Sequence, residues 1–355
     1  MSDLKLRDRD AIVTKEGLIF RVFGYSHPSD SYICDAEYAP ASIFKSDNPK
    51  AFRNKGHRIF YKFYEDEGWQ LVHDRFPRYL VFHEMLQRNI VGVSHNDIVK
   101  VRKPEAALKK LIFRKPRDKL ETAMQDVLGL VTEHSGLHFD NFGVFGSMLH
   151  NFHHPDFSDV DLTIYGREKT ARLRTTLQKL YEDGSFPLTN EFATAKSLRG
   201  KSWRFRNLNP KEFVWHQRRK MIYSLFSDEK SGRIIKVEFE PVKDWVEITS
   251  DYDSETRIVQ KGWAKMLCVI VEASDAPFIP SVYSVKPLEI LCGKDAGEVT
   301  RVVSYMEEFR LQANRGEKVY VEGNLEEVIT SKGHFHQVAL TYCPRYYEQV
   351  LKVAF

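Results

Sequence analysis

The chain has 355 residues, of which 42% are hydrophobic and 29% charged, so it is long enough for two or three domains that each bury a core. Its four cysteines are scattered and include no Cys-x-x-Cys pair, which argues against a disulfide framework or cysteine-bound zinc. The first ten residues lack the apolar core of a signal peptide, and no run approaches the ~18 apolar residues of a membrane span. We therefore expect a soluble, cytoplasmic protein with no membrane partner.

The formal net charge is +4, but the positive charge is concentrated in two segments. Residues 100–120 hold nine lysines and arginines against two acids, and residues 196–220 hold nine against one. The rest of the chain is therefore acidic overall. Positive segments of this kind attract polyanions, so their position matters more than the total charge.

Residues 1–103 are predicted to form a β-rich N-terminal domain. Short apolar and aromatic runs alternate there with turn signals such as Lys15-Glu16-Gly17. The histidines of this segment are dispersed, and no catalytic constellation is evident among them.

Two helices are expected next. The first, from Glu105 to Lys115, is short, amphipathic and basic, with Lys109 and Lys110 facing outward. The second begins at Leu120, where apolar residues recur at intervals of three and four, and it ends near Gly136.

A strand-to-helix corner follows these helices. Asn141 to Phe145 is predicted as a short strand that stops at Gly146-Ser147, after which Met148 and Leu149 have helical spacing. A Gly-Ser pair at such a corner can present backbone N–H groups and a hydroxyl to an anion. We expect Gly146 and Ser147 to form a phosphate cradle.

Residues Ser158 to Tyr165 alternate between polar and apolar side chains, which predicts a strand. Asp159 and Asp161 therefore point to the same side, and eleven residues separate Asp159 from Ser147. Two carboxylates this close repel each other unless a cation lies between them, and their hard oxygen atoms suit Mg²⁺ or Mn²⁺. The sequence therefore predicts a metal site.

A further strand, Arg233 to Val242, offers a third acid. Its alternation places Lys236, Glu238 and Glu240 on one face. The alternation alone leaves open which glutamate is the third metal ligand.

The pattern that runs from the Gly-Ser corner to the two aspartates resembles the signature of the nucleotidyltransferase superfamily, which has Gly-Ser, then a gap, then Asp-x-Asp on a strand. DNA polymerase beta, the CCA-adding enzymes and the minimal nucleotidyltransferases typify that superfamily. The composition and domain order also resemble archaeal nucleotidyltransferase-domain proteins, although the resemblance is strong at residues 140–165 and diffuse elsewhere. In CCA-adding enzymes the third acid is followed three residues later by proline. Glu238 and Pro241 fit that spacing, so we prefer Glu238 over Glu240.

The resemblance implies an α+β fold in which a polymerase-beta-like nucleotidyltransferase domain, a mixed sheet with helices at residues 104–249, lies between two β-rich domains. It also implies that Mg²⁺ (or Mn²⁺) is bound by Asp159, Asp161 and Glu238, which would be the catalytic residues. The substrate would be a nucleoside triphosphate such as ATP, with its triphosphate held at Gly146 and Ser147.

Three histidines, His150, His153 and His154, lie between the Gly-Ser pair and the aspartates. The spacing would let His150 and His154 share a helix face, but Pro155 ends any helix there and no cysteine is nearby. We expect these histidines to contact the triphosphate or solvent rather than zinc.

Aromatic residues are interleaved with cations between Lys196 and Lys220, a pattern that favours binding of phosphates and stacked bases. A solvated strand pair with ordinary aromatic packing explains the same pattern equally well. Under the first interpretation the nucleic-acid-binding residues are Lys201, Trp203, Arg204 and Arg206, together with Lys109 and Lys110.

Residues 250–355 are predicted to form a β-barrel-like C-terminal domain, for which an OB-like barrel is one candidate. Runs of strand length from residue 316 onward are separated by glycines placed as barrel corners require. Residues 299–313 suit a helix and a strand about equally.

The sequence therefore predicts a metal-dependent nucleotidyltransferase that moves a nucleoside monophosphate to a hydroxyl, with RNA 3′ ends favoured over other nucleic acids as acceptor. Two alternatives remain open. The chain could be a catalytically silent nucleic-acid-binding protein that keeps the fold, or its acceptor could be a protein or a small molecule.

Overall fold

The computed structural model describes residues 4–193, 203–249, 252–341 and 345–354. The fold is α+β, with three sheets and few helices. The chain forms two compact units. Unit 1 consists of Met1–His83, Arg88–Leu188 and Leu225–Tyr252, and unit 2 of Glu84–Gln87, Thr189–Ser224 and Asp253–Phe355. None of the described helices combines the length and apolar character that crossing a membrane requires.

The N-terminal part of unit 1 is an eight-stranded antiparallel sheet, as its β-rich sequence predicts. Its main path runs β4-β5-β3-β2-β1-β8, and β7 joins β3 to β6. The helix α1, Glu67–Arg75, follows β5. The strands are β1 Ala11–Val13, β2 Ile19–Val22, β3 Ser31–Pro40, β4 Phe52–Lys55, β5 Arg58–Lys62, β6 Leu80–His83, β7 Arg88–Ser94 and β8 Lys100–Arg102.

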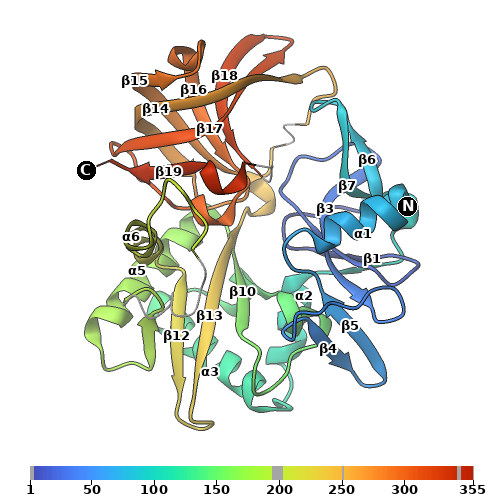
Figure 1. Cartoon of the computed structure of the whole chain (residues 1–355). Helices are drawn as coiled ribbons and strands as arrows, with labels where there is room; N and C mark the ends of the chain where they lie inside the picture. Colours follow the sequence, from blue (N-terminus) through green and yellow to red (C-terminus); the bar gives the residue numbers. More distant parts are fainter. Residues whose placement is uncertain (1–3, 194–202, 250–251, 342–344, 355) are drawn as a thin grey trace. The chain divides into compact units, whose positions relative to one another are not determined.

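The second sheet is mixed and has the order β11-β12-β13-β10-β9. Strand β10 pairs in parallel with β13, which lies beside it in Figure 1, and antiparallel with β9, so it lies between these two strands. The strands are β9 Phe142–Val144, β10 Val160–Tyr165, β11 Leu188–Asn190, β12 Tyr223–Asp228 and β13 Arg233–Val242.

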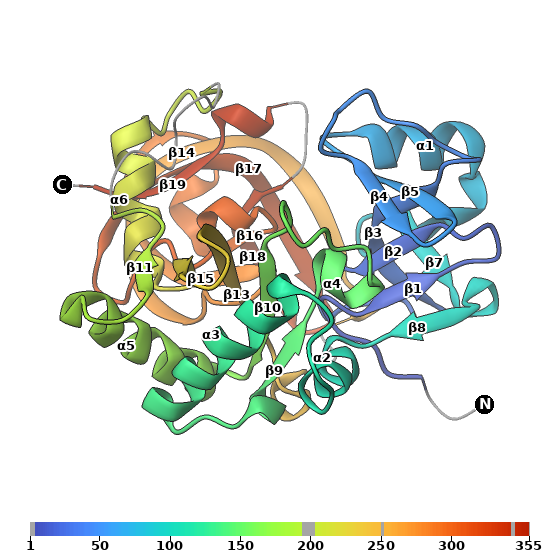
Figure 2. The same cartoon turned by 90° about the horizontal axis from the view of Figure 1, so that it is seen from below.

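Helices accompany this second sheet. The predicted helix beginning at Leu120 is confirmed as α3, Lys119–Ser135, which buries its apolar face and ends at the left-handed Gly136. It lies beside α5, Arg167–Asp183 (Figure 2). The two short helices are α2, Pro104–Ile112, and α4, Gly146–His150.

Within unit 1 the N-terminal sheet packs directly on α4 and the loop after it. A shared core joins Ala11, Ile19 and Tyr38 of the sheet to Phe145, Leu149 and Phe152. The helix is thus covered by the N-terminal strands rather than by solvent. The N-terminal sheet and the Gly-Ser corner are therefore one packed body.

Unit 2 contains the third sheet, in which five strands close into a ring with the order β14-β15-β16-β18-β17-β14. The pair β16–β18 is parallel and the other pairs of the ring are antiparallel. The strands are β14 Arg257–Asp275, β15 Ser281–Cys292, β16 Val299–Ser304, β17 Lys318–Thr330, β18 Gly333–Leu340 and, paired with β17 outside the ring, β19 Val350–Val353.

Two segments of unit 2 settle alternatives that the sequence left open. Residues Pro210–Lys220 form helix α6, because Asn209 and Glu212 make a capping box and Pro210 occupies the first turn, so a strand is wrong there. Residues 299–313 begin as strand β16, and the short 3-10 helix Glu307–Phe309 follows it.

Unit 1 also holds a buried ion pair that tests this packing. Arg9 Nη2 lies 2.6 Å from Glu240 Oε2 on β13, and each side chain is at most 3% exposed. We expect Arg9→Met to destabilise unit 1 by about 3–5 kcal/mol, because it leaves a carboxylate buried without its partner. The double variant Arg9→Met/Glu240→Gln should be less destabilised, as measured by urea unfolding.

The matched control is Arg172→Met, which breaks a solvent-exposed pair with Glu168 and should cost less than about 1 kcal/mol. An Arg9→Met protein as stable as this control would contradict the buried pair.

Candidate active site

Two of the predicted acids lie side by side on the mixed sheet, and the third lies just before it. In the parallel pairing of β10 with β13, Asp161 lies directly opposite Glu238, and Thr163 lies opposite Glu240. Register partners on adjacent strands share a face. Asp159 lies just before β10, outside the strand on which the alternation predicts it, and its charge, like that of Glu238, adds to the rise that burial causes in the pKa of Asp161. The sheet therefore places Asp161 beside Glu238, with Asp159 next to the start of β10.

The two glutamates of β13 have different surroundings. Glu240 is buried and paired with Arg9, whereas the Glu238 side chain is 22% exposed and forms an ion pair with Lys236 of its own strand. Glu238 is thus the glutamate that lies opposite Asp161 and remains open to solvent. The carboxylate of Glu240 is already neutralised by a guanidinium.

The Gly-Ser corner lies against the same acids. Phe145 N–H donates to the backbone oxygen of Asp161 at 3.0 Å, which holds the end of β9 beside β10. Gly146 has a φ of +59°, and a Cβ at this position would lie only 2.3 Å from Asp161 Oδ2. Only glycine therefore lets the backbone of the corner approach the Asp161 carboxylate this closely.

The electrostatics of the acids follow from this crowding. Burial, followed by the charge of Glu238, raises the pKa of the Asp161 carboxyl. Burial also raises the pKa of Asp159, although Lys236 opposes the rise. Carboxylate oxygens are hard ligands suited to Mg²⁺ or Mn²⁺, and a divalent cation would relieve the repulsion that helps to raise the pKa of Asp161.

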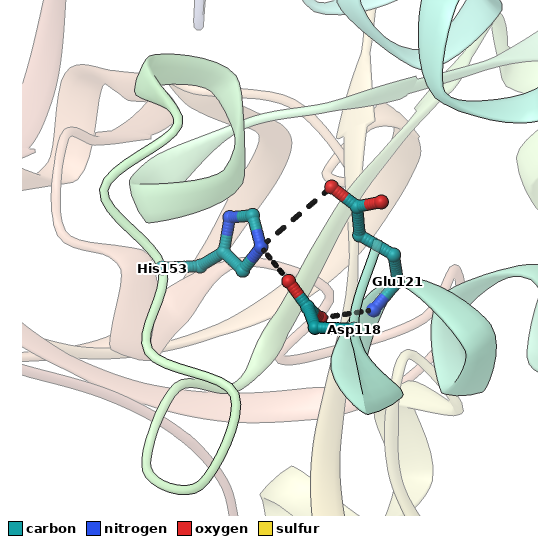
Figure 3. A group of neighbouring side chains, drawn as sticks. All are labelled: Asp118, Glu121 and His153. Carbon is teal, nitrogen blue, oxygen red and sulfur yellow. Dashed lines mark hydrogen bonds and ion pairs between the residues drawn. The ribbon is translucent and has the colours of Figure 1, made fainter. Parts of the chain in front are cut away.

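The loop between α4 and β10 is tied to α3 by a cluster of Asp118, Glu121 and His153 (Figure 3). His153 Nε2 lies 3.0 Å from Asp118 Oδ2 and 3.8 Å from Glu121 Oε1. One ligand atom from each residue lies within 4.8 Å of the others, a spacing that a metal ion could bridge.

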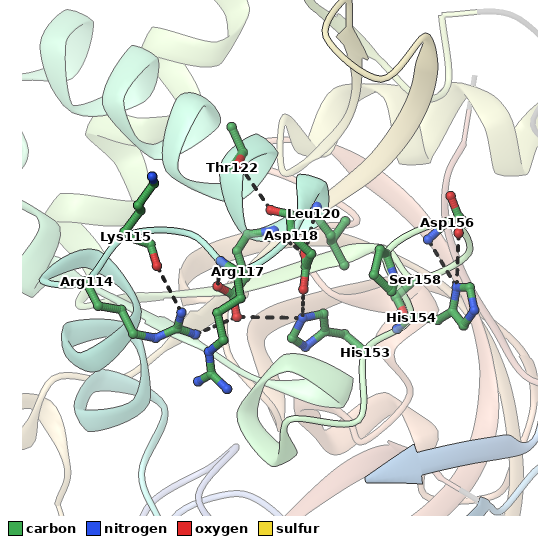
Figure 4. Close-up of polar contacts among 12 residues, drawn as sticks. Arg114, Lys115, Arg117, Asp118, Leu120, Thr122, His153, His154, Asp156 and Ser158 are labelled. Carbon is green, nitrogen blue, oxygen red and sulfur yellow. Dashed lines mark hydrogen bonds and ion pairs between the residues drawn. The ribbon is translucent and has the colours of Figure 1, made fainter. Parts of the chain in front are cut away.

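Further contacts complete this cluster without an ion (Figure 4). Asp118 Oδ1 caps α3 by accepting from the N–H groups of Leu120 and Glu121 at 2.9 and 3.0 Å. Glu121 accepts from Arg114 Nη2 at 2.5 Å and from the Arg117 N–H at 2.8 Å.

The second ring nitrogen of His153 gives a further argument against a metal. A metal-bound histidine normally donates its other N–H to an acceptor, but the buried Nδ1 of His153 has no such partner among the described residues. We interpret the cluster as a structural tie between α3 and the loop that leads to Asp159.

The predicted roles of the histidines need correction. His150 is fully buried and the His153 side chain is only 6% exposed, so solvent exposure is wrong for both; His154 is exposed. Helix α4 ends at His150, so His150 and His154 do not share a helix face.

His150 instead joins α4 to two N-terminal strands. Its Nδ1 accepts from Arg102 Nη1 at 2.6 Å, which leaves the ring proton on Nε2, 3.6 Å from Glu37 Oε2. Burial alone would raise the pKa of Glu37, but the interaction with His150 and the charges of Arg21 and Lys62 lower it to about 2.

The predicted nucleic-acid-binding residues belong to different units. Lys109 and Lys110 are exposed on α2 of unit 1, whereas Trp203, Arg204 and Arg206 belong to unit 2. Lys201 lies outside the described residues. The predicted set is thus divided between the two units, and each part is described with its own unit.

Within unit 2 these side chains have intramolecular partners. Trp203 packs against the barrel core and donates to Leu208 O at 2.8 Å. Arg204 donates to the Tyr347 hydroxyl at 3.0 Å, and Arg206 pairs with Glu348 at 3.1 Å. Aromatic packing thus accounts for part of the interleaved pattern.

The chain resembles an uncharacterized protein of Methanocaldococcus jannaschii, MJ1086, with 27% identity over 338 residues, which is 93% of each chain. No protein-family model and no solved structure matches this chain. The relative therefore supports a shared architecture over almost the whole length and carries no information about activity.

Sequence reasoning missed the contacts that hold the site in place. Asp118 and Glu121 show the spacing of a helix capping box, which is a local signal that could have been read. Nothing near Arg9, Glu37 or His153 in the sequence indicates their partners, because those partners are more than 30 residues away.

The close approach at Gly146 gives a direct test. We expect Gly146→Ala to destabilise unit 1 by at least about 1 kcal/mol, because alanine is strained at positive φ and its methyl group would displace the Asp161 carboxylate. Gly129→Ala, in open space on α3, should instead stabilise by about 0.5–1 kcal/mol. Equal unfolding midpoints for the two variants would refute the close approach.

The His153 cluster is tested with zinc. Adding zinc or a zinc chelator should leave the thermal unfolding midpoint of the wild type unchanged. His153→Ala should be less stable by about 1–2 kcal/mol whether or not zinc is present, because the partly buried carboxylate of Asp118 loses its contact with the buried ring. His57→Ala, at an exposed position, is the control. Zinc-dependent stabilisation seen only in the wild type would instead identify a metal site.

Proposed function

We propose that this chain is a metal-dependent nucleotidyltransferase with a polymerase-beta-like catalytic core. The observation that carries the proposal is the register of β10 and β13, which places Asp161 opposite Glu238. The corner at Gly146 lies against the Asp161 carboxylate on the neighbouring strand. An acidic face beside a backbone corner is the arrangement that a metal-bound triphosphate requires.

Different residues would bind the metal, bind the triphosphate and accept the proton. Asp159, Asp161 and Glu238 would hold Mg²⁺ or Mn²⁺, which supplies positive charge to the phosphoryl oxygens. The N–H groups and hydroxyl at Gly146 and Ser147 would bind the triphosphate. The acceptor oxygen would form a bond to the α-phosphorus as the bond to pyrophosphate breaks, and Glu238 would accept the hydroxyl proton.

For the acceptor we propose a nucleic acid, with RNA favoured. The exposed Lys109 and Lys110 on α2 support a polyanion. The ring order of the barrel, with its third and fifth strands parallel, is the order of OB barrels, which commonly bind oligonucleotides. A protein or small-molecule acceptor and a silent nucleic-acid-binding module are the competing possibilities, and the fold alone does not choose among them.

The decisive experiment follows transfer of label. Wild-type protein is incubated with Mg²⁺, each α-labelled nucleoside triphosphate in turn, and RNA, DNA or protein. We expect label to enter RNA, and Asp161→Asn to lower the rate by about 1000-fold, since the stabilisation supplied by a bound metal is worth several kcal/mol.

The control is Asp156→Asn in the loop before β10, where the side chain is half-exposed and paired with Lys119. This variant should transfer label at nearly the wild-type rate. If Asp161→Asn were as active as wild type, the assignment would be wrong, and nucleic-acid binding without any transfer would favour the silent module.

A further inference from the structure

The N-terminal β-domain has no assigned role, yet one of its faces covers the segment that leads to the acids. Phe60 and Tyr38, on the adjacent strands β5 and β3, both pack on Phe152 of the loop after α4. The ring of Phe60 stacks on Phe152 at 4.6 Å, and that of Tyr38 meets it edge-on at 5.5 Å. This face therefore overlies the chain between Ser147 and Asp159.

Lys62 belongs to the same face. It is the last residue of β5, two residues after Phe60, and it lies directly opposite Tyr38 in the antiparallel pairing of β5 with β3. Residues that are directly opposite in such a pair point to the same side of the sheet. The lysine therefore points toward the body that carries the Gly-Ser corner and the acids.

The charge of Lys62 acts on these acids without being paired to them. From the face that Tyr38 and Phe60 define, its ammonium opposes the rise that burial causes in the pKa values of Asp159 and Asp161. Its described contact is with the ring of Tyr64, at 5.9 Å from Nζ to the centroid, and no described carboxylate forms an ion pair with it. The charge of Lys62 also lowers the pKa of Glu37, but Glu37 already has His150 as a partner.

Two other cations near the acids, Lys236 and Arg233, have partners of their own. Lys236 pairs with Glu238, and Arg233 donates to the backbone oxygens of Pro155 and Ser158. Lys62 is thus a cation beside the acids that keeps its hydrogen-bond donors available. A lysine ammonium is a mobile point charge on a flexible stem, a common ligand for phosphate.

We propose that Lys62 binds a phosphate group of the nucleoside triphosphate, so that the N-terminal β-domain forms one wall of the nucleotide site. This inference rests on the proposed function. It assigns the N-terminal sheet a role in holding substrate in addition to supporting α4. The phosphates concerned are those that leave as pyrophosphate, because the α-phosphate must lie at the acids for transfer.

The test measures binding by calorimetry on the full chain with Mg²⁺ present. The probes are inorganic tripolyphosphate, ATP and AMP, of which AMP lacks the two outer phosphates. Lys62→Met should lower the affinity for tripolyphosphate and for ATP by about 10-fold or more, because charge-assisted hydrogen bonds are lost. The affinity for AMP should stay the same. Lys62→Arg should recover most of the affinity, since it keeps the charge.

Lys100→Met is the matched control, since Lys100 is exposed on β8 of the same sheet. Its affinities should equal those of the wild type. Unfolding midpoints establish that each variant is folded. Equal affinity of wild type and Lys62→Met for tripolyphosphate would overturn the inference.

The inference and the proposed function fail in different ways. If Asp161→Asn abolishes label transfer while Lys62→Met binds tripolyphosphate normally, only the role of Lys62 is wrong, and the lysine is a counter-ion of the acids. If the wild type binds neither tripolyphosphate nor ATP and transfers no label, both are wrong.

Discussion

The parallel pairing of β10 with β13 is the constraint on which the candidate site depends. It places Asp161 opposite Glu238, so two carboxylates from segments far apart in sequence share one face of a sheet. A slip of one residue would turn every acid of β13 to the other face, because the side-chain period of a strand is two. The site therefore exists only in this register, which the buried apolar residues of both strands maintain.

Around this pairing, the structure restrains each segment that enters the site. Asp118 at the start of α3 accepts from His153, and Tyr38 and Phe60 of the N-terminal sheet pack on Phe152. Arg9 neutralises Glu240, which would otherwise add another carboxylate to the same face. The N-terminal sheet thus contacts the segments around the site through packing and through charge, and it belongs to the same compact unit as β9, β10 and β13.

The local features of the site could be predicted because their causes are local. Spacing and backbone preference within a few residues predict the helix from Leu120, the glycine at the strand-to-helix corner and the strand that carries Asp161. That strand begins at Val160, so Asp159, which was predicted on it, precedes it. Interpretations that required knowledge of burial were less successful. His150 and His153 were expected in contact with substrate or solvent, yet both are buried against partners from other segments. The aromatic pattern near Trp203 likewise includes packing on a barrel core.

By itself the sequence determined the position of the Gly-Ser corner and the strand that carries Asp161, because each depends on the residue pattern along one segment. It left Glu238 and Glu240 equivalent in the strand alternation, since both lie on the same face of β13. Only the tertiary structure separated them, by bringing Arg9 to Glu240 and Asp161 to Glu238. The physical reason is that the surroundings of a charged group are set by chain segments that meet only on folding.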